Sequence, residues 1–331
     1  MFPSQFEYFA PSTIEDALAL LAERGEDAKV LAGGQSLIPL MKLRFAAPPV
    51  IVDVNRIPGL DSLEEVGGTE GQSRDAEGQS RGTDGTSRAA DGPPGADQSG
   101  DSDGGRHLRV GALVRNRTLE RSQMLASRYP TVATAAPLIS DPIVRNQGTL
   151  VGSLCHADPQ GDFGSVMLAL EAHVVARSTS GERRIPITEF FEGPFATALR
   201  PDELAVAAGV PAPGEHFFGT YLKLERKVGD FATVGVALFL SMDGGRINRA
   251  GIGLTGVGPT NIKAIDAERS LLGAALSRDA IDEAARLAAA ASEPRTDVRG
   301  SADYKREMVR VFVTRGLREA ADAQALAATS S

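Results

Sequence analysis

Near the amino terminus, apolar residues recur with the spacing of one face of a helix. The capping box Ser12-Thr13-Ile14-Glu15 precedes them, and Gly25 follows them. These start and stop signals predict a helix that buries a single apolar stripe. The stripe consists of Ile14, Ala17, Leu18 and Leu21. Residues 28–32 form the next apolar run, which predicts a short strand leading into a glycine-containing segment.

Two further runs flank a long polar segment. Residues 50–54 are mostly apolar, and residues 107–112 alternate between polar and apolar. Both patterns are typical of strands, and we interpret them as the two arms of one hairpin. Between them, residues 67–105 contain no Val, Ile, Leu, Met, Phe or Tyr. They carry a repeat with a period of seven residues that begins at Glu70. Because such a segment cannot bury enough surface to offset its ordering entropy, we predict a disordered insertion; a partner-binding arm is the alternative.

The rest of the chain mixes helices and strands without the regular alternation of a doubly wound sheet. A linker rich in proline and glycine lies at residues 211–214, and Asp243-Gly244-Gly245 is typical of a hairpin turn. The pattern predicts strands at residues 172–176, 184–187, 219–224, 233–242 and 247–256, and helices at residues 163–171, 262–272, 277–291 and 302–328. This order indicates an α+β chain.

Two glycine-bearing segments far apart in the chain carry the main functional signal. The first is Leu31-Ala32-Gly33-Gly34-Gln35-Ser36-Leu37-Ile38, and the second spans residues 147–162. Glycine allows positive φ and lets a ligand approach the main chain closely. Successive exposed N–H groups then form a concavity that suits a pyrophosphate. Two such loops indicate one long dinucleotide held from two sides.

Composition limits the function without identifying it. The chain has 331 residues, enough for two or three domains, and a formal net charge of -8, which argues against a nucleic-acid partner. Neither a transmembrane span nor a signal peptide is visible, and the use of only one cysteine favours a cytoplasmic protein. A single cysteine excludes an internal disulfide and a cysteine-bound iron–sulfur cluster within this chain. The four histidines have no spacing that suggests a metal site.

Several segments in a consistent order resemble the FAD-binding medium subunit of the molybdenum hydroxylases, the group of carbon monoxide dehydrogenase and xanthine dehydrogenase. They lie at residues 32–37, 145–149, 156–162, 190–194, 227–232, 256–260 and 297–306. The resemblance implies a two-subdomain FAD-binding fold of the vanillyl-alcohol-oxidase/PCMH type, followed by an α+β C-terminal domain with an antiparallel sheet and helices. It implies subdomains at residues 1–57 and 58–213, and a C-terminal domain at residues 214–331.

The same resemblance implies roles for individual residues in binding FAD. The diphosphate would be wrapped by the backbone of Leu31, Ala32, Gly33, Gly34, Gln35, Ser36, Leu37 and Ile38. Thr149, Gly152 and Ser153 would complete this cradle from the second loop. Asp162 would accept hydrogen bonds from a sugar or ribityl hydroxyl, as suits an acceptor-only carboxylate. Alternatively or in addition, Asp162 caps the helix that begins at Phe163.

Three further positions would lie beside the flavin ring. Ile139 would form an apolar wall, or else be ordinary core. Phe231 would cover one face of the isoalloxazine, where the family commonly has tyrosine. Lys223 would place its charge near the flavin, or else be a solvated strand residue. Val151 departs from the family, which usually has glycine there, so either that position does not need positive φ or the phosphate approach has shifted to Gly152.

The implied function is that of an electron-transfer subunit of a heterotrimer, most similar to a carbon monoxide dehydrogenase medium subunit. Electrons would pass from [2Fe–2S] clusters of a small subunit, fed by a large molybdopterin subunit, to the FAD of this chain. The external acceptor would be quinone, NAD or oxygen, and the assembly a dimer of heterotrimers.

Two alternatives remain open from the residues. One is a stand-alone FAD oxidoreductase with His156 or Asp158 as its base, and the other is a flavin-free scaffold, which Val151 favours. Two motifs are weighed and set aside. Residues 251–256 match G-x-G-x-x-G but lie within a predicted strand, and Cys155 is expected to pack rather than to attach FAD covalently.

Overall fold

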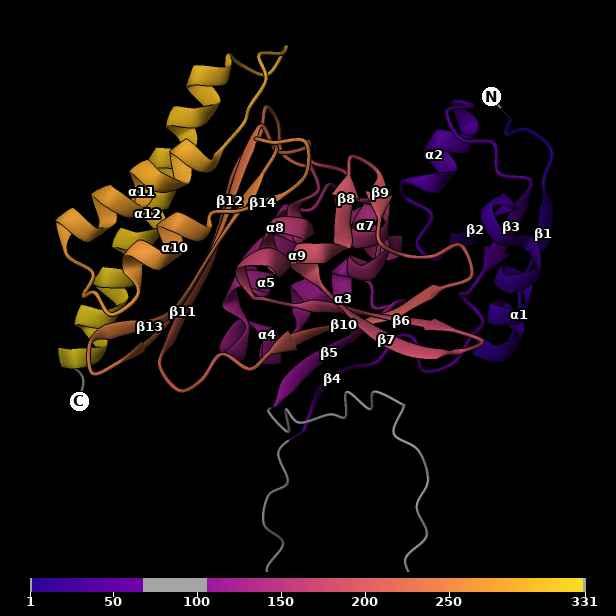
Figure 1. The fold of residues 1–331 in the computed structure, drawn as a ribbon, viewed down its shortest axis with the longest axis horizontal. Helices are drawn as coiled ribbons and strands as arrows, with labels where there is room; N and C mark the ends of the chain where they lie inside the picture. Colours follow the sequence, from indigo (N-terminus) through magenta and orange to yellow (C-terminus); the bar gives the residue numbers. More distant parts are fainter. Residues whose placement is uncertain (1, 68–105, 330–331) are drawn as a thin grey trace, which may run out of the picture.

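The structure, a computed structural model, describes residues 2–67 and 106–329. Its carboxyl-terminal helices and its amino-terminal unit lie at opposite ends of the molecule, with a mixed central region between them (Figure 1). The predicted disordered insertion at residues 67–105 lies almost wholly outside the described residues and stays a prediction. No helix among the described residues is long and apolar enough to cross a membrane.

A small parallel sheet forms the amino-terminal unit. Its strands β1 (Glu7–Phe9), β3 (Val50–Asp53) and β2 (Ala28–Leu31) lie in that order, and helix α1 (Ile14–Arg24) packs on them. The predicted apolar stripe is buried at Ala17, Leu18 and Leu21. The capping box was placed one residue early, because the hydroxyl of Thr13 accepts from the amide of Asp16. Helix α2 (Leu37–Lys42) follows the first glycine loop.

The predicted hairpin between residues 50–54 and 107–112 is wrong. Strand β3 pairs in parallel with β1 and β2, whereas β5 (His107–Gly111) pairs antiparallel with a strand absent from the prediction, β4 (Leu63–Val66). Strand β4 is short and exposed, with the sequence LEEV, so its pattern carries little signal. The insertion therefore joins β4 to β5, and Val66 lies opposite His107 at its base.

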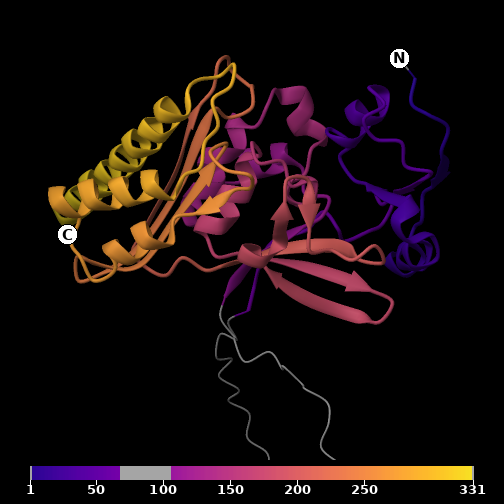
Figure 2. The ribbon, with the colours of Figure 1, turned by 45° about the horizontal axis from the view of Figure 1, so that its top comes forward.

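A five-stranded sheet and a group of short helices form the central unit. The strand order is β4-β5-β10-β6-β7, with β10 at Leu204–Pro211, β6 at His173–Ser178 and β7 at Gly181–Pro186. The helices are α3 (Asn116–Arg121), α4 (Gln123–Arg128), α5 (Pro130–Ala135), α6 (Pro142–Gln147), α7 (Leu150–His156), α8 (Asp162–Ala169) and α9 (Ile187–Phe190). A small hairpin of β8 (Phe191–Gly193) and β9 (Ala196–Thr197) stands beside α7 (Figure 2). Their shared core includes Phe163 and Phe190, both fully buried.

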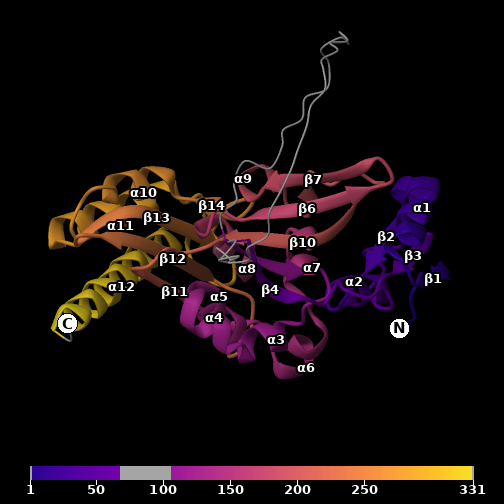
Figure 3. The same cartoon turned by 90° about the horizontal axis from the view of Figure 1, so that it is seen from below.

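The carboxyl-terminal unit is an antiparallel sheet covered on both faces. Its strands run in the order β11 (Phe217–Leu224), β12 (Val234–Asp243), β13 (Arg246–Thr255) and β14 (Ile262–Lys263). Helices α5 and α8 contact it on one side. Helices α10 (Ile265–Leu271) and α12 (Ala302–Thr329) contact it on the other side (Figures 1 and 3). Helix α11 (Arg278–Ala291) packs against α10 and α12. The helix predicted from residue 262 begins at Ile265, because residues 262–263 pair with β13 instead.

The G-x-G-x-x-G segment lies in β13, as its pattern predicted. A Cβ atom on Gly251 would lie 2.7 Å from the carbonyl carbon of Ala169, and one on Gly253 would lie equally close to that of Ser165. These glycines let helix α8 pack closely on the sheet, which explains the motif without a nucleotide.

We expect deletion of residues 68–105 to leave intact both the fold and the flavin binding that the resemblance implies. The deletion would leave Gly67 and Arg106 as a two-residue connection between Val66 and His107, a length that suits a tight hairpin. Thermal unfolding and flavin content are the measurements. A loss of bound flavin or of subunit assembly in the shortened chain would show that the insertion has a function of its own.

Candidate functional site

The two glycine loops meet in the structure. The first loop leaves β2 and turns into α2, and the second joins α6 to α7. A Cβ atom on Gly33 would lie 2.8 Å from the Cα of Gly148 and would collide with the carbonyl oxygen of Gln147. Gly34 has a φ of +71°, in the region that side chains disfavour. Segments more than a hundred residues apart thus come into backbone contact, as a cradle for one ligand requires.

The first loop also fits an anion. Within the described part of the chain, the amides of Gly33, Gly34, Gln35 and Ser36 form no hydrogen bond with protein. Unpaired amides in a glycine turn are the donors that a diphosphate accepts from, so the residues present fit FAD at this point. Around them, Leu31 ends β2 and Ala32 follows it, Leu37 begins α2, and Ile38 is partly exposed.

The second loop forms the amino-terminal turn of α7. The hydroxyl of Thr149 accepts from the amide of Gly152 at 3.1 Å, so both residues also serve as the cap of this helix. Val151 is buried, with an ordinary helical backbone. Position 151 therefore does not need positive φ, and valine fits there. Ser153 lies on the same helix, partly exposed.

A polar bridge that the sequence did not predict joins the two loops. The side-chain amide of Asn55 donates to the carbonyl oxygen of Ala32 at 2.8 Å. Its oxygen accepts from the guanidinium of Arg115, which donates a second bond to the carbonyl oxygen of Gln147, each at 2.6 Å. Burial lowers the pKa of Arg115 from its ordinary value, yet an arginine stays charged. The pair is therefore a fixed cationic link between the cradle's two halves.

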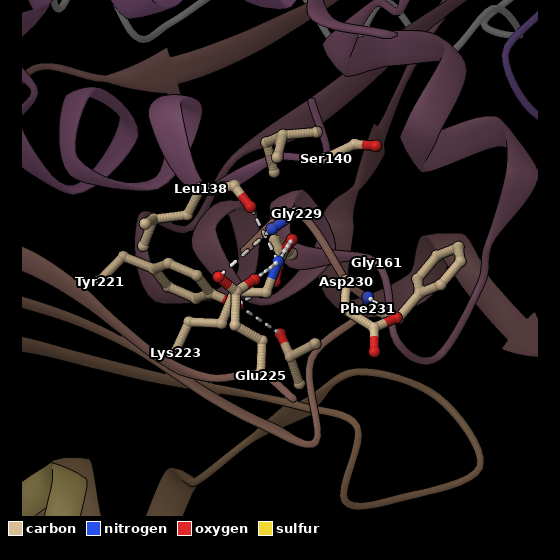
Figure 4. A network of polar contacts seen from close by, with 12 residues as sticks. Leu138, Ser140, Gly161, Tyr221, Lys223, Glu225, Gly229, Asp230 and Phe231 are labelled. Atoms are coloured by element: carbon tan, nitrogen blue, oxygen red, sulfur yellow. Dashed lines mark hydrogen bonds and ion pairs between the residues drawn. The ribbon is translucent and has the colours of Figure 1, made fainter. Parts of the chain in front are cut away.

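Asp162, the first residue of α8, and Lys223 of β11 form a buried ion pair. Figure 4 shows the network of polar contacts around Lys223. The ammonium of Lys223 lies 3.0 Å from one carboxylate oxygen of Asp162, and the hydroxyl of Tyr221 donates to the other at 2.5 Å. Lys223 also donates to the carbonyl oxygen of Leu138 at 2.8 Å and lies 3.4 Å from Glu225. Its side chain is only 2% exposed, so the alternative of a solvated strand residue is wrong.

Burial governs the charges in this cluster. Burial raises the pKa of Asp162, and the positive charge of Lys223 opposes that rise. Burial and the Asp162 charge raise the pKa of Tyr221 well above its ordinary value, so its hydroxyl remains a donor. The alternative role of Asp162 as a helix cap is wrong, because Gly161 holds the cap position and Asp162 begins α8. Tyr221 could have been predicted, because it shares one face of β11 with Lys223.

The turn that carries Phe231 lies beside this cluster. Gly229 has a φ of +83°, and a Cβ atom there would lie 3.0 Å from the carbonyl group of Ser140. The amide of Gly229 donates weakly to Glu225, which links the turn to Lys223. Figure 4 shows the Phe231 ring directed away from the ion pair, and the residue is 52% exposed.

Ile139 lies in the loop that faces this turn. It packs against the central core with part of its surface exposed. Buried Arg145 holds the loop, because its guanidinium donates to the carbonyl oxygens of Ile139 and Ser140 and pairs with Glu120. Both roles weighed for Ile139, flavin wall and core residue, are compatible with this position.

The residues considered for other chemistries, His156, Asp158 and Cys155, have structural roles in packing or in turns. Burial lowers the pKa of His156, which favours its neutral form, and its ring packs against Phe195. Asp158 accepts a hydrogen bond from the amide of Gln160 in a turn. Burial raises the pKa of the Cys155 thiol to about 12, which disfavours the nucleophilic thiolate form. The described residues contain no cluster of His, Cys, Asp or Glu that could hold a metal.

Comparison with known families identifies both halves of the chain. Residues 4–70 and 99–213 match the model described as the FAD binding domain in molybdopterin dehydrogenase. Residues 219–320 match the CO dehydrogenase flavoprotein C-terminal domain. The fold and the paired glycine loops therefore define a flavoprotein subunit of an oxidoreductase, and the predicted fold class is confirmed.

Individual relatives align along the whole chain. It is 37% identical over 320 residues to the carbon monoxide dehydrogenase medium chain of Hydrogenophaga pseudoflava, covering 97% of this chain and 98% of that one. It is 34% identical to the 6-hydroxypseudooxynicotine dehydrogenase complex subunit alpha of Paenarthrobacter nicotinovorans, covering 97% and 96%. The solved structure of the Hydrogenophaga pseudoflava enzyme lacking the Mo-pyranopterin moiety superposes with a TM-score of 0.81 and 38% identity, covering 97% and 98%. The chain belongs to the family of FAD-binding medium subunits of molybdenum hydroxylases.

We expect Arg115→Ala to weaken FAD binding by about tenfold, because about 1–2 kcal/mol of charged hydrogen bonding between the loops is lost. Arg109→Ala is the matched control, since the Arg109 side chain hydrogen-bonds only Ser62 among the described residues. Titration of flavin fluorescence measures the affinity. Equal affinity in the two variants would show that the bridge does not hold the cradle.

Proposed function

We propose that this chain binds one FAD and passes electrons between partner subunits and an external acceptor. The observation that carries the proposal is the backbone contact between the two glycine loops, with unpaired amides on the first of them. A diphosphate that links two larger groups, as in a dinucleotide, fits a site formed by two glycine loops that face each other. Bound FAD supplies the chemistry, because it accepts and releases electrons one or two at a time.

The protein's own residues bind and orient. In this proposal the backbone of residues 31–38 donates to the diphosphate, and Thr149, Gly152 and Ser153 complete the cradle. Asp162 receives a ribityl or sugar hydroxyl in addition to its protein donors. Lys223, held by Asp162 and Glu225, supplies positive charge near the ring. Ile139 and Phe231 supply apolar contact to the ring.

The partners belong to the proposal as well. A large subunit would carry the molybdopterin cofactor and a small subunit the two [2Fe–2S] clusters, as a dimer of heterotrimers in the cytoplasm. The chain resembles both a carbon monoxide dehydrogenase medium chain and a subunit of a 6-hydroxypseudooxynicotine dehydrogenase complex, so we assign the choice of substrate to the large subunit. In this proposal, residues 1–57 and 58–213 are the two FAD-binding subdomains and residues 214–331 are the C-terminal domain.

The two rival functions have less support. A stand-alone oxidoreductase would need a base facing the flavin, whereas Asp158 is engaged in a turn and Phe195 packs on His156. The flavin-free scaffold was favoured by Val151, because valine disfavours positive φ. Residue 151 has an ordinary helical backbone, so Val151 no longer argues against FAD binding.

The experiment is purification of the tagged chain from its native cells. We expect a large and a small subunit to accompany it, and the flavin spectrum to bleach when the substrate of the large subunit is added without oxygen. A chain that purifies alone and whose flavin is reduced directly by a small-molecule substrate would contradict the proposal.

A further inference from the structure

The turn that carries Phe231 is held from one side by a residue of the carboxyl-terminal unit. Arg299 lies in the connection between α11 and α12. Its guanidinium donates to the carbonyl oxygen of Phe231 at 2.6 Å and lies 3.2 Å from the carboxylate of Asp230. Two neighbouring residues of the turn are thus gripped by one fork of donors, a geometry that arginine provides and lysine does not.

Arg299 is itself held in place by α12. Asp297 accepts from the backbone amide of Arg299 at 2.8 Å and pairs with Lys305 at 2.7 Å. The Lys305 side chain is 3% exposed and donates a second bond to the carbonyl oxygen of Arg295. The arginine therefore stands on a short loop anchored to a long helix, rather than on a free surface.

The Phe231 ring has little support of its own. The residue is 52% exposed, and neighbouring Val228 is 96% exposed. On the inner side, Gly229 packs against Ser140, and the amide of Asp230 donates to the carbonyl oxygen of Lys227. These contacts fix the base of the turn, while the backbone at Phe231 itself is fixed by Arg299 and by the Asp230 side chain.

We propose that Arg299 is a positioning residue that holds the Phe231 turn where its ring can cover the flavin, a role that rests on the proposed function. A stacked aromatic ring contributes only when its backbone is held in register with its partner. By gripping both Asp230 and the Phe231 carbonyl, Arg299 makes the carboxyl-terminal unit part of the flavin site. Removing it leaves the ring present but free to move.

The chain has no tryptophan, which allows a direct test. In the full chain, Phe231→Trp places a single tryptophan on the turn. Adding Arg299→Ala should abolish the slow component of its fluorescence anisotropy without FAD present, and should weaken FAD binding by about tenfold. Arg299→Lys, which keeps the charge but not the fork, should retain part of the slow component. Arg306→Ala, which removes a surface pair with Asp303 on α12, is the control and should change neither value.

The outcomes separate this proposal from the function on which it rests. Unchanged anisotropy in Arg299→Ala would overturn the role of Arg299, whether or not FAD binds. If saturating FAD fails to quench the tryptophan in the Phe231→Trp chain, then residue 231 does not stack on flavin and the proposed function loses that contact. If the Arg299→Ala variant does not fold, the Arg299→Lys variant in the Phe231→Trp background provides the test. If its anisotropy equals that of Phe231→Trp alone, the paired donors of arginine are not needed and the proposal is overturned.

Discussion

Replacing Gly33 with alanine should abolish FAD binding while the chain still folds. The new Cβ atom would collide with the backbone of Gln147 and Gly148, which cannot move aside as a flexible side chain can. The two loops would have to separate, and the cradle would lose its spacing. We expect affinity to fall by more than about a hundredfold, since a misplaced contact site loses most of its binding energy. Flavin fluorescence titration of the purified variant measures this.

A second glycine supplies the control for that experiment. A Cβ atom on Gly193 would meet only the Cβ of Ala196, at 4.0 Å. Gly193→Ala should therefore bind FAD as the natural chain does. If Gly33→Ala also retains the natural affinity, the loop contact does not shape the ligand site and the central argument from geometry fails.

Replacing Lys223 with methionine should destabilise the protein by about 3–5 kcal/mol, because it leaves the buried carboxylate of Asp162 without its cation. The double variant Asp162→Asn/Lys223→Met should recover more than about half of that loss, since the buried charge of Asp162 is removed together with its partner and only Glu225, which is 17% exposed, loses its cation. Arg286→Met, which removes an exposed pair with Glu283, should leave stability nearly unchanged. Urea unfolding measures all three. A Lys223→Met loss as small as that of Arg286→Met would contradict a buried, coupled pair.

The pH dependence of the Lys223→Met loss follows from the same burial. Burial raises the pKa of Asp162, and the variant removes the cation that opposes this rise. A raised carboxyl pKa means that the folded state holds the proton more tightly than the unfolded chain does, so stability falls as pH rises between the two pKa values. The loss should therefore shrink as pH falls from about 7 to about 5. A loss that grows on acidification would show that Asp162 is not the residue affected.

The sequence predicted the parts of the site that depend on local pattern. The glycine loops were visible because free main-chain approach requires glycine, and α1 was visible because its buried stripe has helical spacing. The partner of β5 was missed because β4 is short, polar and separated from it by the insertion. Parallel pairing of β3 with β1 and β2 likewise depends on contacts that no local pattern reports.

The side chains that hold the site together were also missed, for a physical reason. Arg115 reaches Asn55, which lies 60 residues away in the sequence, and Arg299 reaches the Phe231 turn across 68 residues. Such contacts are set by how units pack, and a lone arginine in a loop has no periodicity to mark it. Tyr221 was missed as well, although its place two residues before Lys223, on the same face of β11, could have predicted it.

Release of the flavin from the purified native complex tests the central claim most directly. Acid denaturation followed by chromatography distinguishes FAD from FMN and gives its amount per chain. Because two loops in backbone contact would hold one diphosphate between them, we predict FAD, one molecule for each copy of this chain, and no FMN. A complex that releases FMN, or a colourless one that takes up no flavin when incubated with FAD, would contradict the account.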